Sequence, residues 1–197
     1  ALIDRARLQA GESLVVLAAG GGTGLAAVDL GVALGARVIA VAGTEDKLAL
    51  AGQRGADVLL NSRDTDLDAA LRDYTGNHGA DVIFDPVGGD LFDTCCRRMA
   101  WGGRYLVVGF AAGRIPQFAV NLCLVKGFSL VGVFTDDFIN REPARYERTI
   151  AELQGLLRAG GLNPGIHLAG ELAELPRVLP ELYAGRALGK LVLARSS

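Results

Sequence analysis

A glycine-rich turn that follows an apolar run constrains the fold of this chain more than any other feature. Residues 14–18 are apolar, residues 20–24 hold four glycines and Thr23, and a helical run continues to Gly35. This order predicts a strand, a tight turn and a helix. Glycines let a backbone approach an anion closely, and a helix N-terminus offers free N–H groups and a favourable dipole end. The stretch therefore predicts a binding site for a diphosphate.

The motif departs from the strict glycine-x-glycine-x-x-glycine form at one position. Ala19 stands where the first glycine would be, so the pattern reads Ala19-x-Gly21-x-x-Gly24. Such a motif is weak alone, and its strand-turn-helix setting strengthens it. A loop that merely closes a strand-helix turn is the alternative, which this setting disfavours.

Apolar segments and helical segments alternate along most of the chain, after a helix end over residues 1–8. Further strands are predicted at residues 37–42, 57–61, 81–85, 103–110 and 128–134, and helices at residues 44–53, 64–74, 91–99, 120–126 and 143–159. Continuous apolar strands separated by helices indicate a parallel sheet covered on both faces. The predicted fold class is α/β, with a doubly wound Rossmann sheet of six parallel strands in the order 3-2-1-4-5-6.

The last part of the chain follows a different pattern. Residues 161–170 read as irregular, a helix over residues 172–183 is interrupted by Pro176 and Pro180, and residues 190–194 read as a final strand. We expect residues 1–162 to form the dinucleotide-binding domain and residues 163–197 to belong to a second one.

Charge and apolar patterning exclude several partners. The chain has 20 Lys and Arg against 22 Asp and Glu, which leaves no basic face for nucleic acid. No apolar stretch is long enough to span a bilayer, so no membrane association is expected. The chain begins at Ala1 and its one methionine is Met99, so we expect it to be part of a longer protein.

Cysteine and histidine usage bears on compartment and metal binding. Three cysteines, two of them adjacent (Cys95 and Cys96), are too few for a disulfide framework and predict a reducing, cytoplasmic location. His78 and His167 are the only histidines, and no Cys-x-x-Cys occurs. The sequence therefore predicts no metal site.

The ends of the predicted strands are the places to look for ligand contacts. The second strand ends at Ala42-Gly43-Thr44, without the Asp or Glu that an NAD site places on the ribose 2′-hydroxyl. Lys47 follows one turn later, and Arg63 stands after the third strand. Space and positive charge at this strand end suit the 2′-phosphate that NADPH has and NADH lacks, so NADPH is favoured. The alternative is that Lys47 is an ordinary solvated lysine.

In this order the motifs resemble those of the medium-chain dehydrogenase/reductase superfamily. They are Ala19-x-Gly21-Gly22-Thr23-Gly24, Ala42-Gly43-Thr44-x-x-Lys47, Gly55-Ala56-Asp57, Asp85-Pro86-Val87-Gly88-Gly89, Gly102-Gly103-Arg104, Val107-Val108-Gly109-Phe110 and Gly189-Lys190. The nearest likeness is to the zinc-free NADPH:quinone oxidoreductase, or zeta-crystallin-like, branch, and it covers nearly the whole chain. It implies that the tail returns to a GroES-like catalytic domain, most of which is absent.

The resemblance also implies contacts for the cofactor. It assigns the diphosphate to Gly20, Gly21, Gly22 and Thr23, the adenosine phosphate to Gly43, Thr44 and Lys47, and the nicotinamide to Gly109, Phe110, Val133 and Phe134, with Lys190 near the cleft. Ser62 takes an adenosine position where relatives often have an aromatic residue or His. Thr23 replaces the usual valine, and Thr135-Asp136-Asp137 replaces an aromatic-containing run.

The expected reaction is hydride transfer from NADPH to a quinone or an α,β-unsaturated carbonyl, with the cofactor supplying the chemistry. No catalytic side chain is assigned, and we expect this chain alone to bind NADPH without reducing a substrate. An enoyl reductase acting on acyl thioesters is the enzymatic alternative, and a non-catalytic NADPH-binding sensor or crystallin-like protein is the alternative of another class.

The sequence lacks a feature that each of two other nucleotide-binding families requires. A short-chain dehydrogenase requires Tyr-x-x-x-Lys, and none of the four tyrosines has a lysine four positions later. A methyltransferase would place an acid where the second strand ends, and none is present there.

The strand from Phe128 to Phe134 would lie at the edge of the sheet. An apolar edge is rarely left bare. We therefore expect a homodimer that joins two sheets through this strand, as the resemblance also implies.

Overall fold

A computed structural model describes residues 1–164 and 166–195, with the backbone alone for residues 166–169. Its core is a sheet of six parallel strands in the order β3-β2-β1-β4-β5-β6, which confirms the predicted fold class and strand order. The strands are β1 Ser13–Leu17, β2 Arg37–Ala42, β3 Val58–Asn61, β4 Ala80–Asp85, β5 Met99–Val107 and β6 Ser129–Gly132.

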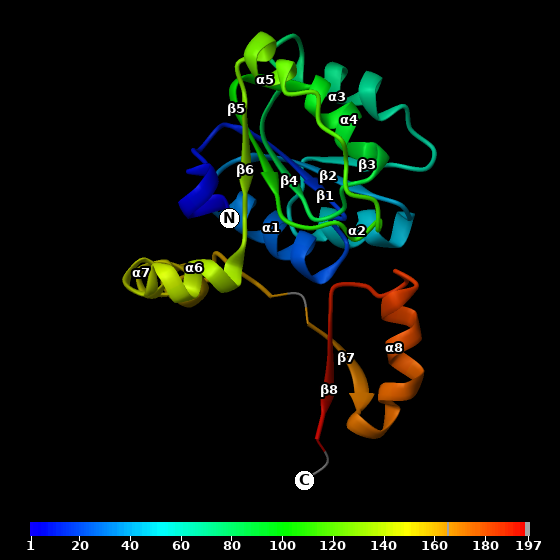
Figure 1. Ribbon diagram of the computed structural model, residues 1–197. Helices are drawn as coiled ribbons and strands as arrows, with labels where there is room; N and C mark the ends of the chain where they lie inside the picture. The colour runs from blue at the N-terminus through cyan, green and yellow to red at the C-terminus, as the bar shows by residue number, and fades with distance from the viewer. Residues whose placement is uncertain (165, 196–197) are drawn as a thin grey trace.

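Helices cover both faces of this sheet (Figure 1). Alternate residues of β1 point to opposite faces: Leu14 and Val16 pack in one buried cluster, and Val15 and Leu17 in the other. The helical segments of this domain are η1 Leu2–Ala6, α1 Gly22–Ala33, α2 Glu45–Gln53, α3 Leu67–Thr75, α4 Asp90–Arg97, α5 Asn121–Lys126, α6 Thr135–Arg141 and α7 Pro143–Arg158. Burial on both faces explains the continuous apolar strands.

Several predicted bounds are wrong, and for β5 the reason is its pairing with β4. The predicted helix over residues 91–99 stops at Arg97, since Met99 pairs with Ala80 and begins β5. At its other end β5 stops at Val107, so Gly109 and Phe110 lie in the loop that follows. Residues 135–141, for which no helix was predicted, form α6.

The tail forms a separate sheet of two parallel strands, β7 Ile166–Glu171 and β8 Lys190–Ala194. The prediction of an irregular segment over residues 161–170 is therefore wrong where β7 lies, and Gly165 lies outside the described residues. The strand that pairs with β7 begins about 20 residues after β7 ends, and no local sequence pattern predicts such a pairing.

Helix α8 (Leu175–Tyr183) follows a short η2 (Leu172–Glu174) and runs through both prolines. The predicted interruption is wrong: Pro176 lies in the first turn, where no N–H is needed, and Pro180 is accommodated within the helix. The tail elements lie apart from the six-stranded sheet in Figure 1, where they are orange and red. The domain boundary at residue 162 stays a prediction. Within the described residues, no helix is long and apolar enough to cross a membrane.

Candidate cofactor-binding cleft

A cavity of about 320 Å³ lies at the carboxyl ends of β1 to β4. Five of the predicted contact residues border it together: Gly21, Gly22, Gly43, Lys47 and Ser62. The other lining residues are Ala18, Val41, Ala42, Val87, Leu91, Leu182, Gly185, Ala187 and Gly189. Open α/β sheets bind ligands at this position, outside the carboxyl ends of their strands.

The glycine turn is held tightly between β1 and α1. The Gly21 N–H donates to the Ala18 carbonyl at 3.0 Å, and the Leu25 N–H donates to the Gly21 carbonyl at 2.8 Å. A Cβ atom at Gly24 would lie 2.1 Å from the Ala18 oxygen, so this position requires glycine. Ala18 takes the left-handed conformation at φ 53°. The strained residue of the turn is thus Ala18, one position before the alanine that interrupts the motif.

Helix α2 packs directly against the turn through Lys47. A Cβ atom at Gly20 would lie 2.4 Å from the Lys47 Cβ, so the absence of a side chain allows this approach. The Lys47 ammonium donates a hydrogen bond to the Gly185 carbonyl. Burial, followed by the nearby Arg63 guanidinium, lowers the pKa of Lys47. Thr23 is exposed in the first turn of α1, away from this contact.

A second cation, Arg63, lies next to a residue of the cavity wall although it does not line the cavity itself. A Cβ atom at Gly43 would lie 3.2 Å from the Arg63 Nε, so Arg63 lies directly over Gly43. The Ser62 N–H donates to the Ala42 carbonyl at 2.9 Å, which joins the carboxyl ends of β2 and β3. Thr44 is the N-cap of α2, but its side chain makes no capping hydrogen bond and does not border the cavity.

The predicted nicotinamide residues lie elsewhere. A Cβ atom at Gly109 would lie 3.2 Å from the Pro86 oxygen, and one at Gly88 would lie 3.0 Å from the Phe110 ring, so this pair borders the turn after β4. Val133 and Phe134 border a different cavity, of about 520 Å³, beside α6 and α7. The chain as described therefore does not bring all predicted contacts into one cleft.

The tail reaches the glycine turn at the start of β8. The Gly189 N–H donates to the Gly20 carbonyl at 2.9 Å, and Gly189 forms a parallel bridge with Gly21. A Cβ atom at Gly22 would lie 3.6 Å from the Lys190 Cα. Lys190 therefore lies beside the turn, as expected. The tail residues Leu182, Gly185 and Ala187 also line the cleft. No motif marks these three residues, so they could not be predicted from the sequence.

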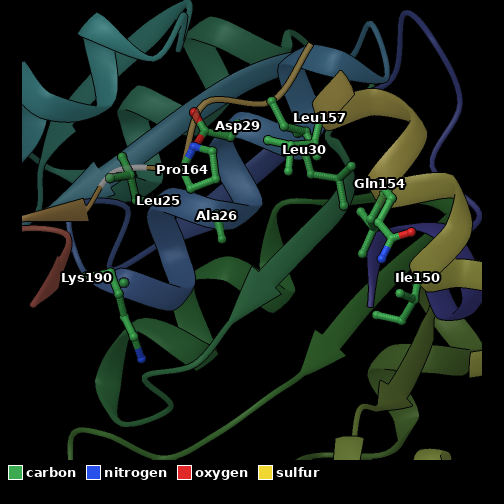
Figure 2. A pocket seen from close by; sticks show the side chains of 12 residues that line it. Leu25, Ala26, Asp29, Leu30, Ile150, Gln154, Leu157, Pro164 and Lys190 are labelled. Carbon is green, nitrogen blue, oxygen red and sulfur yellow. The ribbon is translucent and has the colours of Figure 1, made fainter. Parts of the chain in front are cut away.

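A larger apolar cavity of about 580 Å³ separates α1 from α7. Figure 2 shows Leu25, Ala26 and Leu30 on one wall and Ile150 and Leu157 on the other. Burial raises the pKa of the Asp29 carboxyl in this wall. Of the predicted contacts, Gly22 and Lys190 border this cavity. It adjoins the glycine turn without including the ends of β2 and β3.

Comparison with known proteins assigns the family. A family model described as zinc-binding dehydrogenase matches residues 22–154, which run from the start of α1 through strands β2 to β6 and into α7. The chain belongs to the zinc-binding dehydrogenase family. The resemblance to the medium-chain dehydrogenase/reductase superfamily and its quinone oxidoreductase branch is confirmed.

Several known proteins resemble the chain over nearly its whole length. Quinone oxidoreductase-like protein 2 of Mus musculus is 33% identical over 98% of this chain and 56% of its own length. The chain thus spans about half the length of this curated relative. CurA of Vibrio vulnificus, solved in complex with NADPH, superposes with a TM-score of 0.84 at 26% identity, covering 100% of this chain and 60% of CurA. Highly-reducing polyketide synthase 1 of Aureobasidium melanogenum is 30% identical over 100% of this chain and 9% of its own length.

The family description names zinc, whereas the sequence predicts no metal site. In the part of the chain that the structure describes, no three His, Cys, Asp or Glu side chains gather as a metal would require. Zinc independence of the whole protein stays a prediction.

Proposed function

We propose that this chain is the NADPH-binding part of an oxidoreductase that transfers a hydride to a quinone or an α,β-unsaturated carbonyl. One observation carries the proposal: the 320 Å³ cavity combines a glycine turn at the start of α1 with a β2 end that lacks an acid and is flanked by Lys47 and Arg63. A helix N-terminus favours a diphosphate, and two cations favour a further phosphate.

The residues present fit the diphosphate and the adenosine half of a dinucleotide. The backbone of Gly21 and Gly22 faces the cavity, and no Cβ atom blocks approach there. We assign these two residues to the diphosphate and Gly43, Lys47 and Ser62 to the adenosine phosphate. Bound NADPH would supply the hydride, whereas the chain binds the cofactor, orients it and excludes water.

The choice of NADPH over NADH rests on charge. Glu45, the first acid after β2, accepts a hydrogen bond from the Asn61 amide at 2.8 Å and is thereby held at the β3 end. Lys47 lines the cavity together with Gly43, and Arg63 lies next to Gly43, so both cations are available to receive a 2′-phosphate. Titration of the chain with each cofactor, followed by nicotinamide fluorescence, tests this assignment. We expect NADPH to bind about tenfold more tightly or better; a preference for NADH would overturn the assignment.

An enoyl reductase acting on acyl thioesters is the second candidate, favoured by the match to the polyketide synthase. Both candidates share the cofactor cleft and differ in the acceptor. The discriminating experiment assays the full-length protein with quinones, enones and acyl thioesters. Selective turnover of acyl thioesters would replace the first proposal with the second.

We further propose that residues 1–162 are the cofactor domain, that residues 163–197 complete a separate catalytic domain, and that this chain alone reduces no substrate. The separate two-stranded sheet of the tail supports the boundary. The β6 strand at the sheet edge supports a homodimer joined through residues 128–134. Cysteine usage supports the reducing cytoplasm as the compartment.

A further inference from the structure

Asp85, the last residue of β4, is a buried acid that the cofactor assignment does not use. Its side chain and backbone are 2% exposed. One carboxylate oxygen accepts hydrogen bonds from the Val87 N–H at 2.7 Å and from the Gly88 N–H at 2.8 Å. The carboxylate thus holds the turn that follows β4 in one conformation.

The second carboxylate oxygen has a partner on the neighbouring strand. The Tyr105 hydroxyl donates to it at 2.7 Å, and Tyr105 itself is 0% exposed. The Tyr105 ring packs edge-on against Phe92 of α4 at a centroid distance of 4.9 Å. Burial raises the pKa of Tyr105, so the hydroxyl remains protonated and donates. A buried carboxylate with all its oxygens paired is a rigid anchor.

The backbone of Asp85 fixes a second segment. Its carbonyl accepts hydrogen bonds from the Val108 N–H at 2.9 Å and the Gly109 N–H at 3.3 Å. The Ala111 N–H then donates to the Pro86 carbonyl at 3.1 Å. One residue therefore holds the ends of both β4 and β5.

The anchored turn is a wall of the cofactor cleft. Val87 borders the same cavity as Gly43 and Ser62, the residues assigned to the adenosine half. We propose that Tyr105 and Asp85 are positioning residues, which set Val87 against the adenosine half of the cofactor. This inference rests on the proposed function. It assigns a binding role to a tyrosine that lies inside the core and does not line the cavity.

Tyr105→Phe is the direct test, because it removes the hydroxyl and keeps the ring. Ser13→Ala is the matched control, because it also removes a largely buried hydroxyl that donates to a carboxylate. The Ser13 hydroxyl donates to Asp81 at 2.8 Å, and this bond joins β1 to β4 at the opposite end of the sheet. The 197-residue chain is titrated with NADPH and with ADP bearing a 2′-phosphate. Amide hydrogen exchange is followed at Val87 and Gly88.

We expect Tyr105→Phe to raise the Kd for both ligands about tenfold and to speed exchange at the two amides. We expect Ser13→Ala to lower the melting temperature without changing either readout. The inference is wrong if Tyr105→Phe and Ser13→Ala give the same affinities and the Val87 and Gly88 amides stay protected in both.

A second variant keeps the test decisive if Tyr105→Phe does not fold. Asp85→Asn can still accept from the Val87 and Gly88 N–H groups and can donate to the Tyr105 oxygen. We expect it to keep both amides protected and to bind ADP bearing a 2′-phosphate like the wild type. Asp85→Ala removes both acceptor oxygens, and we expect it to speed exchange at both amides and to raise the Kd for ADP bearing a 2′-phosphate about tenfold. An Asp85→Ala variant that stays protected and binds like the wild type would overturn the inference. Failure of the wild type to bind NADPH would refute the proposed function instead, while the exchange data would still report on the anchor.

Discussion

The Lys47 ammonium donates a hydrogen bond to the carbonyl of Gly185, a residue 138 positions later in the chain. This contact links α2, which packs on the glycine turn, to the loop between α8 and β8 that covers the cleft. Lys47 therefore has a backbone partner in place of the phosphate that we assign to it. A bound 2′-phosphate would compete with this carbonyl for the same ammonium.

Replacing Lys47 should weaken NADPH binding selectively. Lys47→Gln removes the charge, and we expect Kd for NADPH to rise about tenfold to a hundredfold while Kd for NADH changes little. Calorimetric titration with both cofactors measures the difference. Lys126→Gln, on α5 and away from the cleft, is the control and should leave both affinities unchanged. Equal weakening of NADPH and NADH would show that Lys47 does not contact the 2′-phosphate.

Two glycines in helices should respond oppositely to alanine. Gly24→Ala places a methyl group 2.1 Å from the Ala18 backbone oxygen, which cannot move aside, so we expect a loss of about 3 kcal/mol of unfolding free energy. Gly155→Ala in α7 meets no atom within 4 Å and should stabilise by about 0.5–1 kcal/mol through helix propensity. Urea unfolding of both variants measures this. A neutral Gly24→Ala would mean that the turn can open.

The Glu12–Arg104 ion pair should make stability depend on acid pH. The hydrogen bond from Arg104 lowers the pKa of Glu12 below its ordinary value of 4.5. A carboxyl with a lowered folded pKa stabilises the fold above its unfolded pKa, and that contribution is lost as pH falls through the folded pKa. The wild type should therefore lose stability below about pH 4.5 more steeply than Glu12→Gln. The urea midpoint of unfolding, measured for both proteins from pH 6 to pH 3, gives the pH dependence of their stability. Midpoints that fall in parallel in the two proteins would contradict the prediction.

The exposed edge of β6 should mediate dimer formation. Ser129 and Gly132 are exposed on this strand, and two added lysines there would repel each other across a strand-to-strand interface. We expect the wild type to sediment as a dimer and the Ser129→Lys, Gly132→Lys variant as a monomer. Leu59→Lys, on the opposite edge strand β3, is the control and should remain dimeric. A wild type that stays monomeric at high concentration would refute the dimer.

The sequence alone determined the sheet and the start of the cleft. Apolar runs separated by helices specify buried parallel strands, and the glycines after β1 specify a tight turn in which Gly20 and Gly24 leave no room for a Cβ atom. These signals are local: each depends on residues a few positions apart. The absence of an Asp or Glu at the end of β2, and the position of Lys47 one turn later, are local features too and could be predicted from the sequence.

Only the tertiary structure decided which residues share a cavity. It brought Leu182, Gly185 and Ala187 from the tail to the glycine turn, and it placed Val133 and Phe134 in a different cavity. It also paired β7 with β8 and tied Tyr105 to Asp85. Contacts between residues far apart in the chain depend on how whole elements pack, and packing leaves no short-range pattern in the sequence.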